Sequence, residues 1–186
     1  MASRTKAAEP NRLAINRLGL WLFFLSESFL FSALLVARYY LQGVSRPADL
    51  NQTLGFVISF ILILSSLTAY RAETAVAHGA EQMFRRNILY TIVLGALFIA
   101  GVGIEWSEGF RHFPPQRGFG TIFFTLTGFH AFHVFTGILA LIVLILPGQR
   151  GRFTPENHWG AEAIIKYWHF VDVVWVFIFP TLYLVS

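Results

Sequence analysis

The sequence has no cysteine and little charge. Only 13% of its 186 residues are Asp, Glu, Lys or Arg, whereas a soluble domain carries about 25%. Because 55% of the residues are hydrophobic, this composition excludes an ordinary water-soluble globule. The missing cysteines exclude disulfides, thiolate zinc sites, iron–sulfur clusters and thiolate-bridged copper centres. Any redox chemistry in this chain would therefore depend on its six histidines.

Long apolar segments take up most of the chain. A helix needs about 20 mostly apolar residues to cross a bilayer. Five segments meet this requirement, at about 18–39, 50–70, 87–106, 119–146 and 162–185. The connections between them are too short to form another domain. The sequence thus predicts an all-α membrane protein, with a basic tail at 1–17 followed by a single five-helix domain at 18–186. We interpret its first apolar segment as a spanning anchor and not as a cleaved signal peptide.

Basic residues are unevenly divided between the two ends of these segments. One side has nine: Arg4, Lys6, Arg12, Arg17, Arg71, Arg85, Arg86, Arg150 and Arg152. The other side has four: Arg38, Arg46, Arg111 and Arg117. Because basic loops stay on the cytoplasmic side, we expect a cytoplasmic N-terminus and an external C-terminus. The basic residues form no stripe along a helix, which argues against a nucleic-acid partner.

Four ionisable residues in the predicted spans form two pairs. His130 and His133 are three residues apart, as are His169 and Asp172, so each pair shares one helix face. Three histidines and a carboxylate could ligate a metal. The alternative is a set of hydrogen bonds between helices, which we favour because aromatic and aliphatic residues surround both pairs.

Two glutamates also lie in the apolar segments. Glu27 is near the predicted midplane, where it is either a neutral acid that donates a hydrogen bond or a carboxyl that exchanges protons. Glu105 adjoins Trp106 near a membrane boundary, so we expect it to meet headgroups or water. Arginines at the helix ends determine topology or contact anionic lipid headgroups; these are Arg85, Arg86, Arg150 and Arg152.

Several sequence strings resemble cytochrome c oxidase subunit III. Residues 167–175 read Tyr-Trp-His-Phe-Val-Asp-Val-Val-Trp, and residues 127–134 read Thr-Gly-Phe-His-Ala-Phe-His-Val. Shorter matches include Ser-Glu at 26–27. One departure is Val102, where members of that family often carry glutamine. The resemblance extends from about residue 18 to the end, although many members have seven helices.

This resemblance implies an accessory subunit of a haem–copper terminal oxidase. Such a subunit binds no haem or copper itself and packs in the membrane beside catalytic subunit I, together with electron-entry subunit II and phospholipids. It further implies that Glu27 is linked to proton uptake, and that His130, His133, His169, Asp172 and Glu105 are structural polar positions. The expected location is the inner membrane of a prokaryote.

Other functions are compatible with the same fold. A quinol oxidase or a nitric oxide reductase system could use such an accessory chain. A self-standing proton channel or transporter is a further alternative, although no inverted repeat is visible. A haem-binding electron carrier is the last alternative function.

Overall fold

The computed structural model describes residues 11–43, 47–48, 50–116, 118–146 and 151–185. Five of the basic residues used to predict the topology lie outside these ranges: Arg4, Lys6, Arg46, Arg117 and Arg150. The predicted tail is described only from Asn11 onward.

Five long helices make up the described structure. They are α1 (Arg12–Gln42), α2 (Gln52–Ala77), α3 (Glu81–His112), α4 (Gly118–Ile145) and α5 (Trp159–Phe179), and a π-helical turn, η2 (Pro180–Leu184), extends the last. All five are long and apolar enough to cross a membrane. The predicted all-α fold with five spans is therefore confirmed.

Most helices extend beyond the apolar segments that predicted them. For example, α1 begins at Arg12, six residues before the predicted start at 18, and α3 runs from Glu81 to His112 around a predicted span of 87–106. Asparagine side chains cap two helix starts: Asn11 Oδ1 accepts from the Ala14 N–H at 3.4 Å, and Asn51 Oδ1 from the Leu54 N–H at 3.0 Å.

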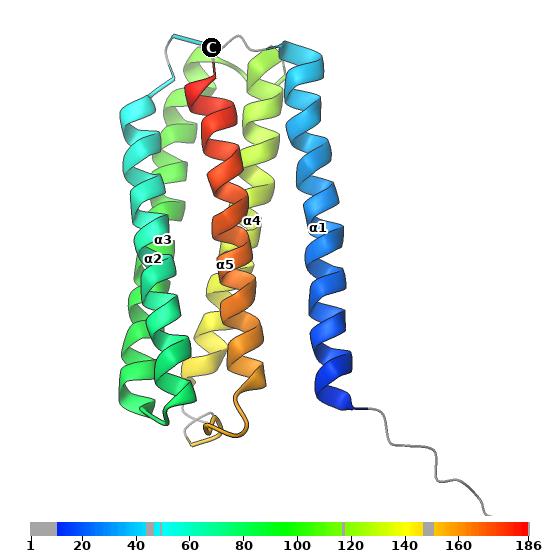
Figure 1. Cartoon of the computed structure of the whole chain (residues 1–186). Helices are drawn as coiled ribbons and strands as arrows, with labels where there is room; N and C mark the ends of the chain where they lie inside the picture. The colour runs from blue at the N-terminus through cyan, green and yellow to red at the C-terminus, as the bar shows by residue number, and fades with distance from the viewer. Residues whose placement is uncertain (1–10, 44–46, 49, 117, 147–150, 186) are drawn as a thin grey trace, which may run out of the picture.

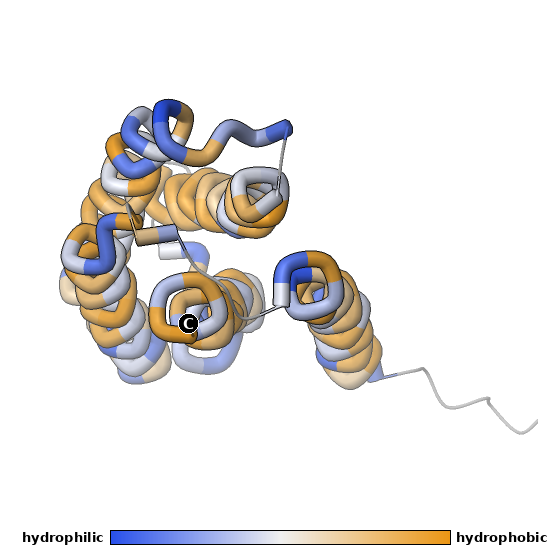
Figure 2. The backbone as a smooth tube through the Cα atoms, turned by 90° about the horizontal axis from the view of Figure 1, so that it is seen from above, coloured by the Kyte–Doolittle hydropathy of each residue, from blue (hydrophilic) through white to orange (hydrophobic). Residues whose placement is uncertain are grey.

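Helices α2 to α5 form the bundle, and α1 lies at its edge. Figure 1 shows α1 beside α4 and α5, with its N-terminal half diverging from the others. The end-on view in Figure 2 likewise shows α1 apart from the other four helices. The closest pair is α2 and α3, which form an antiparallel hairpin. Gly79, with φ of +70°, supplies the left-handed backbone conformation in its turn.

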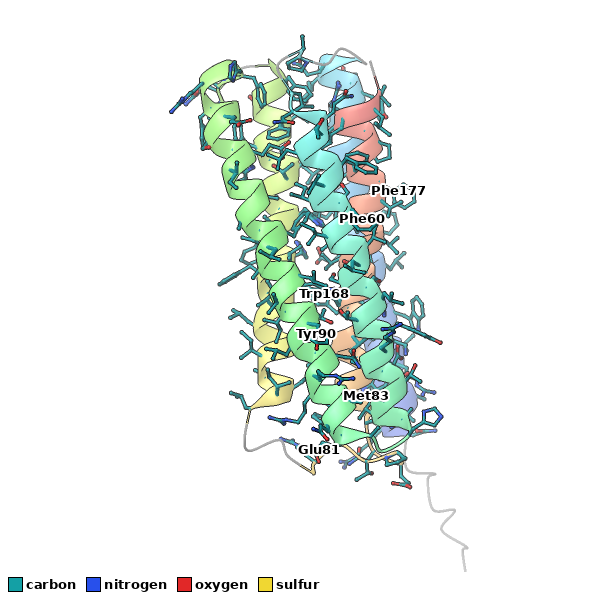
Figure 3. All side chains as sticks on the ribbon, turned by 90° about the vertical axis from the view of Figure 1, so that its left-hand side faces the viewer. Phe60, Glu81, Met83, Tyr90, Trp168 and Phe177 are labelled. Carbon is teal, nitrogen blue, oxygen red and sulfur yellow. The ribbon has the colours of Figure 1, made fainter. Side chains whose placement is uncertain are left out.

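The bundle is centred on Trp168 of α5, which contacts three other helices. Its side chain is 1% exposed and packs on Gly95 of α3 and Gly137 of α4, and its Nε1 donates to Ser65 Oγ of α2 at 3.0 Å. Figure 3 shows Trp168 behind the α2–α3 face, within the bundle. Two turns further, Trp175 Nε1 donates to Ser59 Oγ at 2.8 Å. These tryptophans join α5 to α2.

Candidate functional site

A carboxyl group and an imidazole meet between α1 and α4. Glu27 is the central residue of α1, and its Oε2 lies 3.2 Å from Nε2 of His133 on α4. Their side chains are 20% and 11% exposed, so most of the pair is withdrawn from the surface. Two ionisable groups that are 106 residues apart in the sequence thus form one buried pair near the middle of two spanning helices.

The contacts of the imidazole determine how many protons this pair holds. His133 Nδ1 lies 2.7 Å from the carbonyl oxygen of Phe129, which can only accept a hydrogen bond, so Nδ1 carries a proton. A hydrogen bond between Nε2 and Glu27 Oε2, which lie 3.2 Å apart, needs one further proton, and either atom can carry it. The pair is either a neutral acid that donates to a neutral imidazole or an imidazolium–carboxylate ion pair. Moving one proton by a short distance interconverts the two states.

Polar and aromatic groups from three helices hold the pair in place. The Tyr167 hydroxyl of α5 donates to the carbonyl oxygen of His133 at 3.1 Å and lies 2.9 Å from Thr136 Oγ1. Phe31 of α1 packs edge-on against the His133 ring, with their centroids 5.1 Å apart. The imidazole therefore has a fixed position while its Nε2 faces the carboxyl.

A second group of polar side chains follows the α2–α5 seam. Lys166 Nζ lies 3.2 Å from Glu73 Oε1 and 2.5 Å from Glu162 Oε1. Three residues further along α5, His169 Nδ1 lies 2.7 Å from Ser66 Oγ of α2. Sequence reasoning missed the contact of Lys166 with α2, although its spacing of four residues from Glu162 is typical of a helical ion pair.

Two residues that were predicted to bond across helices have no such partner among the described residues. Neither ring nitrogen of His130 and neither carboxyl oxygen of Asp172 has a partner there in hydrogen-bond geometry, although the Ser66 hydroxyl of α2 lies near the Asp172 carboxyl. His130 is fully buried and lies against aromatic rings, with its centroid 4.8 Å from that of Trp175 and 5.6 Å from that of Phe98. The two predicted pairs therefore separate, because of these four residues only His133 and His169 make side-chain hydrogen bonds to another helix within the described part of the chain.

The expectation for Glu105 was wrong. Glu105 is 2% exposed and meets neither headgroups nor water, because its Oε2 accepts a 2.6 Å hydrogen bond from the buried hydroxyl of Tyr183. A second buried polar group at this end was also missed. Arg38 of α1 is fully buried, donates to the carbonyl oxygen of Gly43 and lies over the ring of Phe119. Its position in an apolar run gave no signal of these contacts.

The predicted headgroup arginines have different surroundings. Arg85 donates to the carbonyl oxygen of Ile145, the last residue of α4, and so fastens α3 to the end of that helix. Arg86 is exposed on α3, and Arg152 is exposed between α4 and α5. Arg150 lies outside the described residues.

Within the described part of the chain, no three histidine, aspartate or glutamate side chains lie close enough together to hold a metal ion. His133 uses both ring nitrogens in hydrogen bonds, and His130 is enclosed by aromatic rings. A carboxyl group in contact with an imidazole is an arrangement through which a proton can be exchanged.

An apolar groove separates α1 from α5 on one side of the pair. One cavity of about 290 Å³ is lined by residues that include Trp21 and Phe24 of α1. An adjoining cavity of about 190 Å³ continues along both helices, and the two share Phe170 and Val173 of α5. Most of the lining is aromatic or aliphatic, and Lys166 and His169 of α5 also line the first cavity.

Comparison with known proteins gives one consistent family. The family model for cytochrome c oxidase subunit III matches residues 10–186. Cytochrome c oxidase subunit 3 of Corynebacterium diphtheriae is 36% identical, and the match covers 100% of this chain and 96% of that protein. The probable cytochrome c oxidase subunit 3 of Nocardia farcinica is 32% identical over 95% of this chain and 89% of its own length. The subunit 3 of the liverwort Marchantia polymorpha is 33% identical over 90% of this chain and 67% of its own length.

The family match covers nearly the whole chain, and the structure has the five apolar helices that such a membrane subunit needs. The chain belongs to the cytochrome c oxidase subunit III family, and with it to an oxidase complex.

Proposed function

We propose that this chain is a non-redox accessory subunit that packs beside the catalytic subunit of a haem–copper terminal oxidase and supports its proton uptake. Family membership carries the proposal of an oxidase partner. The Glu27–His133 pair, in which either group can carry the bridging proton, carries the proposal of a proton-exchanging role. Haem and copper belong to the partner, together with the reduction of oxygen to water. The donor of electrons contacts another subunit.

The proposal also includes the orientation of the chain in the membrane and a bound lipid. The α2–α3 turn and the α4–α5 connection lie at the same end of the bundle as the start of α1 (Figure 1). Most of the basic residues belong to that end, which supports placing it in the cytoplasm of a prokaryotic cell. In the groove between α1 and α5 we propose an acyl chain of a phospholipid, which fills the space that α1 leaves open.

The first test of the proposal is to identify the proteins that co-purify with the chain. A tagged chain is purified in mild detergent, the optical spectrum of the eluate is recorded, and co-eluting chains are identified by mass spectrometry. We expect a haem-bearing oxidase subunit I, and subunit II, to co-elute. Co-elution of a nitric oxide reductase subunit would show that the chain is an accessory protein of nitric oxide reduction. A colourless chain that elutes alone would contradict the accessory role.

The proton-exchanging role is tested by Glu27→Gln. The glutamine amide can still donate a hydrogen bond to Nε2 of His133, but it cannot release a proton. We therefore expect normal assembly and a reduced rate of oxygen consumption. Glu108→Gln, on the exposed end of α3, is the matched control and is expected to retain the full rate. Unchanged turnover in Glu27→Gln would contradict the role, and failure to assemble would show that Glu27 is structural.

A further inference from the structure

A cationic groove lies on the outer face of the α2–α3 hairpin, remote from the Glu27–His133 pair. Its volume is about 490 Å³. Its walls pair residues that are equally distant from the hairpin turn: Tyr70 with Asn87, Arg71 with Arg86, and Thr74 with Met83. Met83 and Tyr90 mark this stretch of α3 in Figure 3, which looks onto the hairpin. We call these six wall residues the hairpin groove.

Both arginines of the hairpin groove have guanidinium groups with no hydrogen-bond or ion-pair partner in the part of the chain that the structure describes. Among the described residues, neither Arg71 nor Arg86 makes a side-chain hydrogen bond or ion pair. In contrast, Arg85 next to them is bonded to the end of α4. No carboxylate of the described residues lines the groove. Glu73, the acidic residue of α2 near it, contacts Lys166 of α5. Among the described residues no carboxylate is paired with either arginine, although Glu81 lines an adjoining cavity together with Arg86.

The two arginines lie at the same depth. Arg71 comes six residues before the end of α2, and Arg86 five residues after the start of α3. At a rise of 1.5 Å per residue, both lie about 8 Å from the hairpin end. With the hairpin end at the outer edge of the headgroup layer, this distance places both arginines beside the lipid phosphates.

Below the arginines, the same helix faces are apolar. Leu67 of α2 and Val93 and Leu97 of α3 are 46%, 50% and 51% exposed. Val93 and Leu97 follow Arg86 at helical spacings of seven and eleven residues, so they continue its face toward the membrane centre. A ligand with an anionic head and long apolar chains matches this surface, whereas a free phosphate ion would use only its upper part.

We propose that the hairpin groove binds one anionic phospholipid, with its phosphate between Arg71 and Arg86 and its acyl chains along the outer face of α2 and α3. Arginine suits this role because its planar guanidinium donates two parallel hydrogen bonds to a phosphate. Phosphatidylglycerol is preferred over phosphatidylcholine, whose own cation cancels the attraction. This proposal requires only that the chain spans a membrane, so it does not depend on the proposed oxidase role.

The test compares lipid binding by the wild type and by Arg71→Gln/Arg86→Gln. Native mass spectrometry counts the phosphatidylglycerol and phosphatidylcholine molecules retained by the purified chain and its co-purifying partners, and a lipid titration gives the affinities. Each basic residue near an anionic headgroup contributes enough that losing two lowers the affinity for phosphatidylglycerol roughly thirtyfold. We expect one fewer phosphatidylglycerol per chain and no change for phosphatidylcholine.

Two further variants make the outcome decisive. Arg111→Gln removes the same charge at the exposed opposite end of α3 and is expected to bind phosphatidylglycerol like the wild type. Arg71→Lys/Arg86→Lys keeps the charge and is expected to retain most of the binding. The proposal is overturned if the double Gln variant binds phosphatidylglycerol as well as Arg111→Gln does. It is also overturned if that variant instead releases a partner subunit, because the groove would then hold an acidic protein segment.

Discussion

The packing of Trp168 makes Gly95 a position where a very small substitution has a large expected effect. A methyl group at Gly95 would lie 2.5 Å from Cη2 of Trp168, about 1 Å inside an ordinary contact. The ring cannot retreat, because Gly137 faces its other side and Ser65 holds its Nε1. Introducing one extra carbon into such a close-packed site costs about 1–3 kcal/mol. We therefore expect Gly95→Ala to lower the stability of the bundle by that amount.

Gly103→Ala is the matched control on the same helix. A methyl group at Gly103 meets nothing within 4 Å, so we expect no loss of stability there. Both variants are unfolded by heat in mild detergent and followed by circular dichroism. Trp168→Phe removes the ring atoms nearest Gly95, so the double variant Gly95→Ala/Trp168→Phe should show a favourable coupling. Equal stability of Gly95→Ala and Gly103→Ala would refute this account of the core.

Three further substitutions test other contacts. Tyr183→Phe removes the donor to the buried carboxyl of Glu105 and should lower stability by about 1–3 kcal/mol, measured by thermal unfolding; a smaller change would show that another group bonds this carboxyl. Phe170→Ala removes the ring that stacks on Phe24 of α1 with centroids 4.9 Å apart, so α1 should become more accessible to limited proteolysis while α2 to α5 stay protected. Lys166→Gln leaves two neighbouring carboxylates without their shared cation and should lower the unfolding temperature, less so in high salt; the same loss at every salt concentration would contradict an electrostatic cause.

The fold could be predicted because the bilayer imposes a simple rule. Each span must be helical and about 20 apolar residues long, and the sequence has five such segments. The helix ends could not be placed in the same way, since α1 and α3 extend past the hydrocarbon into water, where hydrophobicity no longer marks them. Arg12 and His112 are helical although neither is apolar.

The sequence indicated the individual residues of the candidate site, but not which of them contact each other. Intramembrane position singled out Glu27 and His133, yet nothing in the sequence says that they meet across 106 residues. The error on Glu105 has a similar origin. Its neighbour Trp106 indicated a membrane boundary, but Tyr183 of the distant C-terminal segment encloses the carboxyl instead.

The serines that accept hydrogen bonds from the tryptophans of α5 already bond within their own helix. Ser59 Oγ donates to the carbonyl oxygen of Gly55 at 2.7 Å, and Ser65 Oγ to that of Leu62 at 2.6 Å. During synthesis, α2 leaves the ribosome about 100 residues before the tryptophans that will bond to it. Throughout that interval its hydroxyl protons are satisfied, while the oxygen lone pairs stay free. These two hydroxyl groups can therefore lie in lipid without an unsatisfied donor, and each can still accept a hydrogen bond from its tryptophan after α5 is inserted.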